Sequence, residues 1–289
     1  MSEIFDFLKK TEVDSRKKFP SAPPTVDLPL SEEETARPAV EQEFDSVPAV
    51  SEIVPSDKFD LAECSPQLRN ALDPATVVGE QFRALRTRLN LLQKQNEIKV
   101  ILVTSTVPEE GKSFTACGLA GVIAQEPGKR VVVIDLDMRK PGSGRDLGLP
   151  RNHSAVGTAQ VLKGEAGFRS QLLSSTVPEF WFLPAGALPP NPSELLSTPK
   201  LEEMIRSAAD MFDWVIIDSP PVLILSDATM IAPLCDTVLL VVRANSTPAK
   251  LVLESINRIG RERIGGVVIN RQKQMPASHY YYQYYYKKK

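Results

Sequence analysis

The tripeptide Gly111-Lys112-Ser113 ends a loop that follows an apolar run at residues 100–103 and precedes an amphipathic pattern. This order of strand, loop and helix is that of a phosphate-binding P-loop, in which loop amides and a helix N-terminus surround phosphate oxygens. Lys112 would then approach the β- and γ-phosphates, and Ser113 would hold Mg²⁺. The strict pattern has glycine where this chain has Thr106. The loop alone therefore leaves open a chance match in a polar turn.

Three aspartates follow two further apolar runs. Asp135 and Asp137 follow residues 131–134, and Asp218 follows residues 214–217 in a Walker B pattern of four apolar residues and an acid. Such runs are typical of strands buried on both faces of a parallel sheet, and ligands bind at the carboxyl ends of those strands. With Lys112 and Ser113, these acids would supply the groups that phosphoryl transfer needs. The alternative is that Asp135 and Asp218 only cap strand ends.

Strands and helices alternate along the chain and predict how these residues are positioned. We expect a three-layer α/β/α domain with a mostly parallel central sheet. The predicted strands are residues 100–103, 131–134, 179–183, 214–217, 237–243 and 265–270. The predicted helices are residues 74–95, 112–125, 157–162, 191–212, 227–232 and 248–259.

The first of these helices should begin at Pro74, with Asp73 as its N-cap. One side carries apolar residues at steps of three and four, namely Val78, Phe82, Leu85, Leu89 and Leu92. Another side carries Glu80, Arg83 and Arg86 at successive threes. That spacing fits a solvated face with weak ion pairs, or a surface between subunits.

Composition limits the classes of function. A net charge of -2 gives no case for nucleic-acid binding. Cys64, Cys117 and Cys235 lie far apart without metal-ligand spacing, as in a reducing compartment. The start of the chain lacks the pattern of a signal peptide, and no apolar run approaches the length of a transmembrane segment. We therefore expect a cytoplasmic protein.

The sequence predicts three regions. Residues 1–73 are acidic and rich in proline, which predicts a disordered arm whose role is unknown. Residues 74–272 form the P-loop domain. Residues 273–289 form a tail that holds all six tyrosines of the chain beside three lysines, a composition with no evident core to join. The tyrosines are Tyr280, Tyr281, Tyr282, Tyr284, Tyr285 and Tyr286.

Over residues 74–289 the chain resembles the bacterial tyrosine autokinases (BY-kinases) of capsule and exopolysaccharide synthesis. The resemblance is carried by TSTVPEEGKS, VVVIDLDMRKP, VIIDSPP and NPSELLSTPKLEEMI, and above all by the terminal tyrosine cluster. That family also lacks the first P-loop glycine, so Thr106 is no longer an objection. The resemblance implies an ATP- and Mg²⁺-dependent protein-tyrosine kinase that phosphorylates the cluster in trans within a ring-shaped homo-oligomer.

The resemblance also implies roles for single residues. Lys112, Asp135, Asp137 and Asp218 would be catalytic, with Asp135 as the base toward the tyrosine hydroxyl. ATP would be bound by Glu109, Glu110, Gly111, Lys112, Ser113, Phe114, Arg139 and Asn270. Mg²⁺ would be held by Ser113, Asp135, Asp137 and Asp218. Arg139 could instead contact a neighbouring subunit, and Asn270, which matches an adenine-reading position, could be only a turn residue. Glu80, Arg83 and Arg86 match the family's oligomerisation motif.

Without a membrane segment of its own, the chain resembles the soluble form of that family. This implies activation by a membrane-bound polysaccharide copolymerase, recruitment to the inner face of the cell membrane and a cognate tyrosine phosphatase. Two alternatives remain. A partitioning-type ATPase would carry a second lysine where this chain has Val107, and it gives the tail no role. A non-catalytic adaptor would bind nucleotide and serve polysaccharide export by assembly alone.

Overall fold

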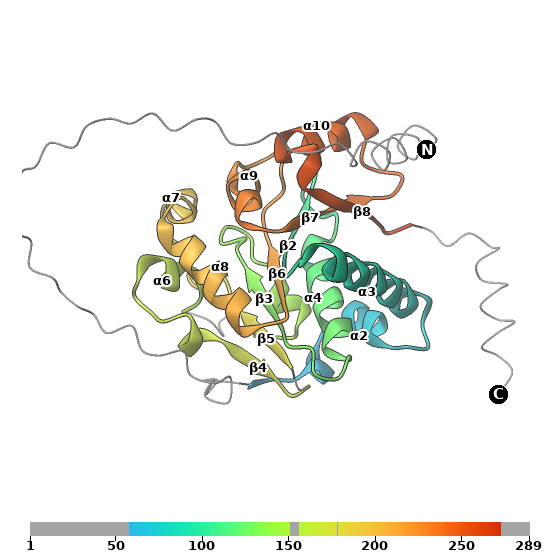
Figure 1. The fold of residues 1–289 in the computed structure, drawn as a ribbon, viewed down its shortest axis with the longest axis horizontal. Coiled ribbons are helices and arrows are strands. Elements are labelled where there is room, and N and C mark those ends of the chain that lie inside the picture. The colour runs from blue at the N-terminus through green and yellow to red at the C-terminus, as the bar shows by residue number, and fades with distance from the viewer. Residues whose placement is uncertain (1–57, 151–155, 178, 273–289) are drawn as a thin grey trace, which may run out of the picture. The chain divides into compact units, whose positions relative to one another are not determined.

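Eight strands form one sheet in the order β1-β4-β5-β3-β6-β2-β7-β8 (Figure 1). The computed structural model describes residues 58–150, 156–177 and 179–272. All neighbouring strands are parallel except β4 and β5, which are antiparallel. The mostly parallel sheet predicted from the sequence is confirmed. Its strands are β1 (Lys58–Phe59), β2 (Val100–Ser105), β3 (Val131–Asp135), β4 (Leu173–Ser175), β5 (Phe180–Leu183), β6 (Trp214–Asp218), β7 (Thr237–Arg243) and β8 (Ile264–Asn270).

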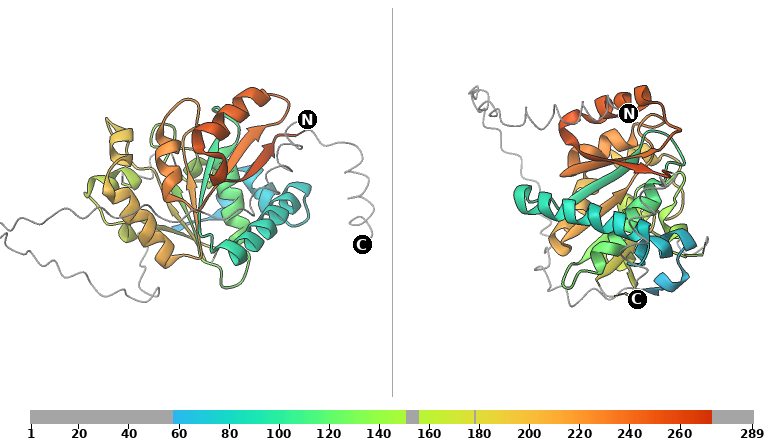
Figure 2. Two further views of the ribbon diagram at one scale, coloured as in Figure 1. Left: turned by 45° about the horizontal axis from the view of Figure 1, so that its top comes forward. Right: turned by 90° about the vertical axis from the view of Figure 1, so that its right-hand side faces the viewer.

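Helices cover both faces of the sheet (Figure 2). One face packs against α2 (Pro66–Leu72), α3 (Val77–Asn96) and α4 (Lys112–Ala124). The other packs against α6 (Thr158–Lys163), α7 (Pro192–Leu196), α8 (Pro199–Met211), α9 (Asp227–Ile231) and α10 (Ala249–Ile259). A four-residue helix, α5 (Ser143–Asp146), follows β3. The short 3₁₀ turns are η2 (Leu61–Glu63), η3 (Arg169–Gln171), η4 (Ala232–Leu234) and η5 (Arg261–Arg263).

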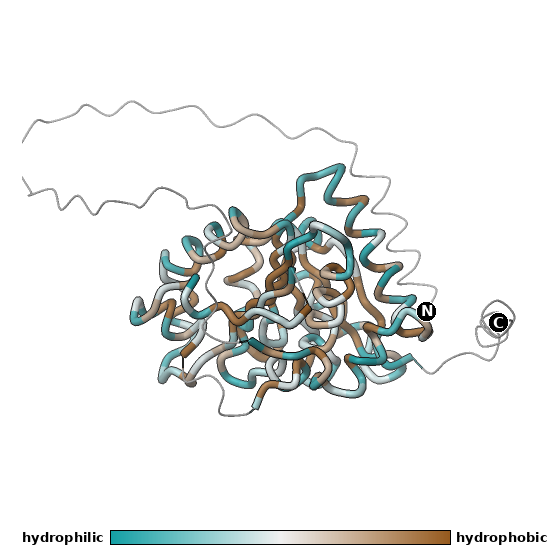
Figure 3. The backbone as a smooth tube through the Cα atoms, turned by 90° about the horizontal axis from the view of Figure 1, so that it is seen from below, coloured by the Kyte–Doolittle hydropathy of each residue, from teal (hydrophilic) through white to brown (hydrophobic). Residues whose placement is uncertain are grey.

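Alternation along the central strands explains why their sequences are apolar throughout. In β2, Val100 and Leu102 join one core while Ile101 and Val103 join the other, and β3 alternates in the same way. Because both faces of a parallel sheet are covered, no position is left for a polar side chain until the strand ends. Many hydrophobic segments accordingly run through the interior of the domain, and hydrophilic segments lie mostly at its outside (Figure 3). Within the described ranges, every helix is too short or too polar to cross a bilayer.

The folded domain begins before the predicted boundary at residue 74. Phe59 is buried in β1 and packs edge-on against Phe180, with the two ring centroids 5.5 Å apart. Leu68 and Ala71 of α2 are fully buried. The prediction of a disordered arm is therefore wrong for residues 58–73. These few apolar residues pack against a core formed by strands that are distant in the sequence. The composition of the segment itself does not predict this packing. The rest of the arm, residues 1–57, and the tyrosine tail, residues 273–289, lie outside the described residues.

Two helix predictions need correction. The first long helix begins at Val77, because the hydroxyl of Thr76 caps it by accepting from the Gly79 amide, while Asp73 ends α2. The helix predicted at residues 191–212 is two helices, α7 and α8, and α8 restarts with Pro199 in its first turn. Proline fits a first turn but not a helix interior, so the break lies where sequence rules allow it.

Candidate active site

The loop between β2 and α4 lies at the carboxyl end of the sheet, beside the ends of β6 and β7. Gly111 caps α4 with φ of 95°, a left-handed conformation that glycine adopts without strain. A Cβ there would lie 2.0 Å from Nδ2 of Asn270, so a side chain would strain the backbone and also displace the Asn270 amide. Lys112 and Ser113 begin the helix and are buried. The strand, loop and helix order predicted for a P-loop is present.

The three predicted acids converge on Lys112. Its Nζ lies 2.7 Å from Oδ2 of Asp137 and 3.5 Å from Oδ1 of Asp218. Asp135 and Asp218 are register partners at the ends of β3 and β6, and both are almost fully buried. Four ionisable groups from three strand ends therefore share one site, as the strand-end positions predicted.

The surroundings of Lys112 and Asp135 raise the pKa of both groups above their ordinary values. Burial disfavours the ammonium of Lys112, but the charges of Asp218 and Asp137 outweigh it and raise its pKa above the ordinary value. Burial, and then the negative charge of Asp218, raise the pKa of Asp135 well above its ordinary range. Asp135 therefore holds a proton more readily than an exposed aspartate, while Lys112 stays charged.

One oxygen of Asp135 is buried without a hydrogen-bond partner among the described residues. Its Oδ1 accepts the Asp137 amide at 3.0 Å, whereas Oδ2 accepts nothing. A buried carboxylate oxygen left unpaired is costly, so this atom is available to a ligand or a proton donor.

The oxygen donors fit Mg²⁺. The Oγ of Ser113 lies 3.4 Å from Nζ of Lys112, which also contacts the carboxylate of Asp218, and hydroxyl and carboxylate oxygens suit that ion. No three His, Cys, Asp or Glu side chains in the described ranges stand close enough to hold a metal by themselves. Mg²⁺ usually needs only one or two carboxylates and completes its shell with waters and substrate phosphates. The donor set therefore fits a nucleotide-bound Mg²⁺ better than a dedicated metal cage.

Two residues predicted to bind ATP direct their side chains elsewhere. Glu110 is 1% exposed, and its carboxylate accepts from the amides of Val107 at 2.9 Å and Arg243 at 3.0 Å and from the Thr247 hydroxyl. Phe114 packs edge-on against Phe82 of α3, with the two ring centroids 5.6 Å apart. Both side chains brace the loop within the protein, a role that the motif alone does not distinguish from ligand contact. The side chain of Glu109 is largely exposed, 3.9 Å from Lys140.

Arg139 and Asn270 also have partners inside the chain. Arg139 donates to Oγ of Ser193 at 3.0 Å and lies 3.8 Å from the buried carboxylate of Asp227, to which Ser193 also donates. Asn270 donates from Nδ2 to the carbonyl of Glu110 at 2.8 Å and so holds the P-loop directly. Sequence reasoning missed Ser193 and Asp227, because their link to Arg139 spans distant parts of the chain.

The predicted oligomerisation residues do not all face solvent. Glu80 pairs with Arg83 at 3.4 Å on α3. Arg86 is instead bound within its own chain, 3.0 Å from Glu126 and donating to the carbonyl of Val122 at 2.6 Å. These bonds fix α3 against the end of α4. Arg83 is likewise held within its own chain, because its side chain is only 18% exposed and donates to the Pro74 carbonyl at 2.8 Å, so Glu80 is the most exposed of the three.

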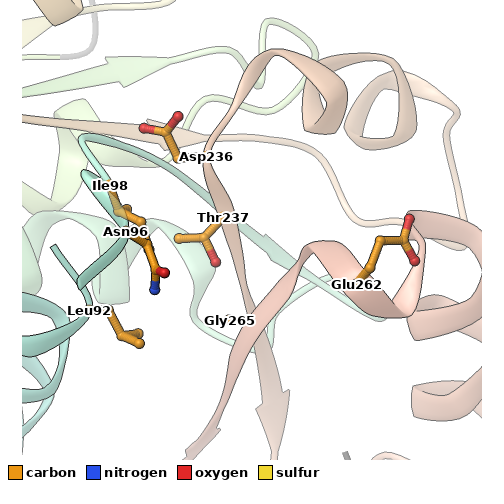
Figure 4. Close-up of a pocket in the computed structure, with 7 residues that line it drawn as sticks. All are labelled: Leu92, Asn96, Ile98, Asp236, Thr237, Glu262 and Gly265. Atoms are coloured by element: carbon orange, nitrogen blue, oxygen red, sulfur yellow. The ribbon is translucent and has the colours of Figure 1, made fainter. Parts of the chain in front are cut away.

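A hollow of about 340 Å³ lies at the opposite, amino-terminal edge of the sheet (Figure 4). Asp236 lines it, but the carboxylate of Asp236 accepts the amides of Lys99 and Val100 at 2.8 and 2.7 Å. The hollow is separate from the P-loop and carries no chemistry that we can assign. It is lined by Leu92, Asn96, Ile98, Asp236, Thr237, Glu262 and Gly265.

Comparisons with known proteins agree with this geometry. A family model described as an AAA domain matches residues 98–262. The tyrosine-protein kinase YwqD of Bacillus subtilis is 32% identical over 203 residues, which cover 70% of this chain and 84% of YwqD. The tyrosine-protein kinase wzc of Salmonella typhimurium is 34% identical over 71% of this chain, which spans only 28% of wzc. The kinase domain of Escherichia coli tyrosine kinase ETK superposes with a TM-score of 0.65 at 32% identity, over 74% of this chain and 84% of that domain.

Proposed function

Because the chain belongs to the bacterial tyrosine-protein kinases, we propose that it transfers the γ-phosphoryl group of ATP to tyrosine hydroxyls, including those of its own C-terminal cluster. The observation that carries this proposal is the convergence of Lys112 with three buried acids beside the P-loop. Family membership sets aside the partitioning-type ATPase. The cluster, Tyr280 to Tyr286, lies outside the described residues.

Each group at the site has a proposed task. Lys112 leaves its carboxylate partners for the phosphate oxygens, whose negative charge replaces theirs. Ser113 and Asp218 would hold Mg²⁺, with Asp137 in support. When bound, that ion neutralises charge on the β- and γ-phosphates. Oδ2 of Asp135, which accepts no other bond among the described residues, would take the proton of the attacking tyrosine hydroxyl.

The raised pKa of Asp135 supports this last role. A carboxylate whose pKa lies nearer to neutrality accepts a proton more effectively than an ordinary aspartate. Burial produces the shift and also excludes the water that would compete with tyrosine for the phosphoryl group.

We further propose that transfer occurs in trans within a homo-oligomer and regulates extracellular polysaccharide polymerisation or export. Each phosphate adds a charge of about -1.5 to -2, so progressive phosphorylation of the cluster should loosen the assembly. A membrane-bound copolymerase would recruit the kinase to the inner face of the membrane and activate it, and a tyrosine phosphatase would reverse the modification. The named relatives support the kinase activity, and these partners are expectations that follow from the resemblance.

The test is anti-phosphotyrosine detection with mass mapping after incubation with Mg·ATP. The full chain is compared with Lys112→Met and with a chain that ends at Ser278. We expect signal confined to the tyrosine cluster and absent in both variants. Lys94→Met, which removes an exposed lysine near the end of α3, is the matched control and should retain the signal. Silence of the full chain even with a copolymerase cytoplasmic segment present would refute the kinase proposal and favour a non-catalytic adaptor.

A further inference from the structure

Ser143 is a buried hydroxyl inside the acidic site that neither the sequence motifs nor the proposed function uses. Its Oγ donates to Oδ2 of Asp218 at 2.8 Å, and both residues are fully buried. The two residues are 75 positions apart, so this bond depends on the tertiary fold. The other oxygen of Asp218, Oδ1, faces Lys112 at 3.5 Å. One oxygen is therefore fixed by Ser143 and the other is directed into the site.

The position of Ser143 is held tightly from two sides. Ahead of it, a Cβ on Gly142 would lie 2.5 Å from Oγ of Ser113, so this turn rests directly on the proposed Mg²⁺-binding hydroxyl. Behind it, the Asp146 carbonyl at the end of α5 accepts the Ser65 amide at 2.9 Å. The turn that carries Ser143 is thus clamped between the P-loop helix and the N-terminal part of the domain.

We propose that Ser143 is a positioning residue for Mg²⁺·nucleotide binding, acting through the orientation of Asp218. This inference rests on the proposed function, because it presumes that Asp218 serves the nucleotide-bound ion. A hydroxyl that donates to one oxygen stops the carboxylate from rotating and keeps the other oxygen directed toward the ion. Outer-shell partners of this kind typically contribute about 10- to 100-fold in metal affinity or activity.

The experiment measures binding of a fluorescent ADP analogue to the full chain, with Mg²⁺ and with EDTA. The wild-type chain should bind more tightly with Mg²⁺. In Ser143→Ala this gain from Mg²⁺ should fall about tenfold, while binding in EDTA stays unchanged. Ser143→Thr, which keeps the hydroxyl, should restore most of the gain. Ser170→Ala, an exposed serine that donates to the nearby Gly167 carbonyl, should behave like the wild type.

The outcomes separate this inference from the proposed function. The positioning role is overturned if Mg²⁺ increases the affinity of Ser143→Ala for the analogue as much as it increases that of the wild type. It is also overturned if Ser143→Ala loses the same affinity with Mg²⁺ as with EDTA. If Ser143→Ala does not fold in thermal unfolding, Ser143→Cys gives the same test, because its thiol is similar in size and only a weak donor. Failure of the wild-type chain to bind the analogue at all would instead refute nucleotide binding, and the proposed function with it.

Discussion

Replacing Glu110 by alanine should destabilise the domain substantially although no cation pairs with its carboxylate within the described residues. Glu110 accepts the Val107 amide within the P-loop, and the Arg243 amide and Thr247 hydroxyl beyond the end of β7. Alanine leaves both amides without their acceptor. A buried unsatisfied donor costs about 1–3 kcal/mol, and because both bonds are only partly buried the lower half applies. The expected loss in the free energy of unfolding is about 2–4 kcal/mol.

Glu110→Gln isolates the bond between the Glu110 carboxylate and the Val107 amide. The side-chain carbonyl oxygen of glutamine can still accept from Arg243 and Thr247, but its amide nitrogen then meets the N–H of Val107, donor against donor. About half of the alanine penalty should remain, roughly 1–2 kcal/mol. If glutamine proved as stable as glutamate, the bond to Val107 would contribute nothing.

Urea denaturation of the full chain, with linear extrapolation to water, measures both variants. Glu109→Ala is the matched control, since the adjacent glutamate is 76% exposed and its ion pair with Lys140 spans 3.9 Å. It should change stability by less than about 0.5 kcal/mol. A loss for Glu110→Ala no greater than that of Glu109→Ala would refute the argument that the buried carboxylate braces the loop.

Three further predictions concern the helices around the site. Phe82→Ala should lower the free energy of unfolding by about 3–5 kcal/mol, because it leaves a cavity against Phe114 in the α3–α4 interface. If urea denaturation shows almost no decrease in this free energy, the packing role is excluded. Arg86→Ala should lower the free energy of unfolding by about 1–3 kcal/mol at any protein concentration, because its ion pair with Glu126 lies within one chain. A decrease seen only under conditions that favour an oligomer would contradict this. Burial raises the pKa of Asp146, so the unfolded chain loses this proton first and stability should fall as pH rises above about 4. The stabilisation by Asp146→Asn, measured from unfolding midpoints, should therefore grow as pH rises above about 4, and an opposite trend would show that the carboxylate is favoured in the fold.

The sequence was sufficient to predict β2, β3, β5, β6, β7 and β8, but not β1 or β4. It also predicted that Lys112 lies close to Asp135, Asp137 and Asp218. Short runs of apolar residues predict strands of a parallel sheet that is covered on both faces. The residues that follow such strands must lie at the same edge of the sheet, because parallel strands end there. Motif spacing then identified the acids without any knowledge of distances. The predictions therefore succeeded where the function of a residue follows from its place on a strand.

The residues that brace the site could not be predicted in the same way. A position in the P-loop motif does not reveal that Glu110 turns toward Arg243, or that Ser143 donates to Asp218 across 75 positions. The N-terminal elements were missed because β1 has two residues and α2 has seven, too few for a periodic pattern. Their stability comes from tertiary contacts such as that of Phe59 with Phe180.

Asn270 has a consequence for how the tyrosines meet the phosphoryl donor. Because its amide binds the Glu110 carbonyl, the last strand ends in contact with the P-loop of the same chain. Nine residues separate Asn270 from Tyr280, and the ten Cα–Cα steps between these two residues span at most about 35 Å in any conformation. That upper limit exceeds the distance from a P-loop to the phosphates it would hold, so tether length does not prevent a chain from phosphorylating itself. The proposed transfer between subunits would then have to be imposed by the arrangement of an oligomer. At concentrations where such an oligomer dissociates, the rate of phosphorylation per chain would report directly on the intramolecular route.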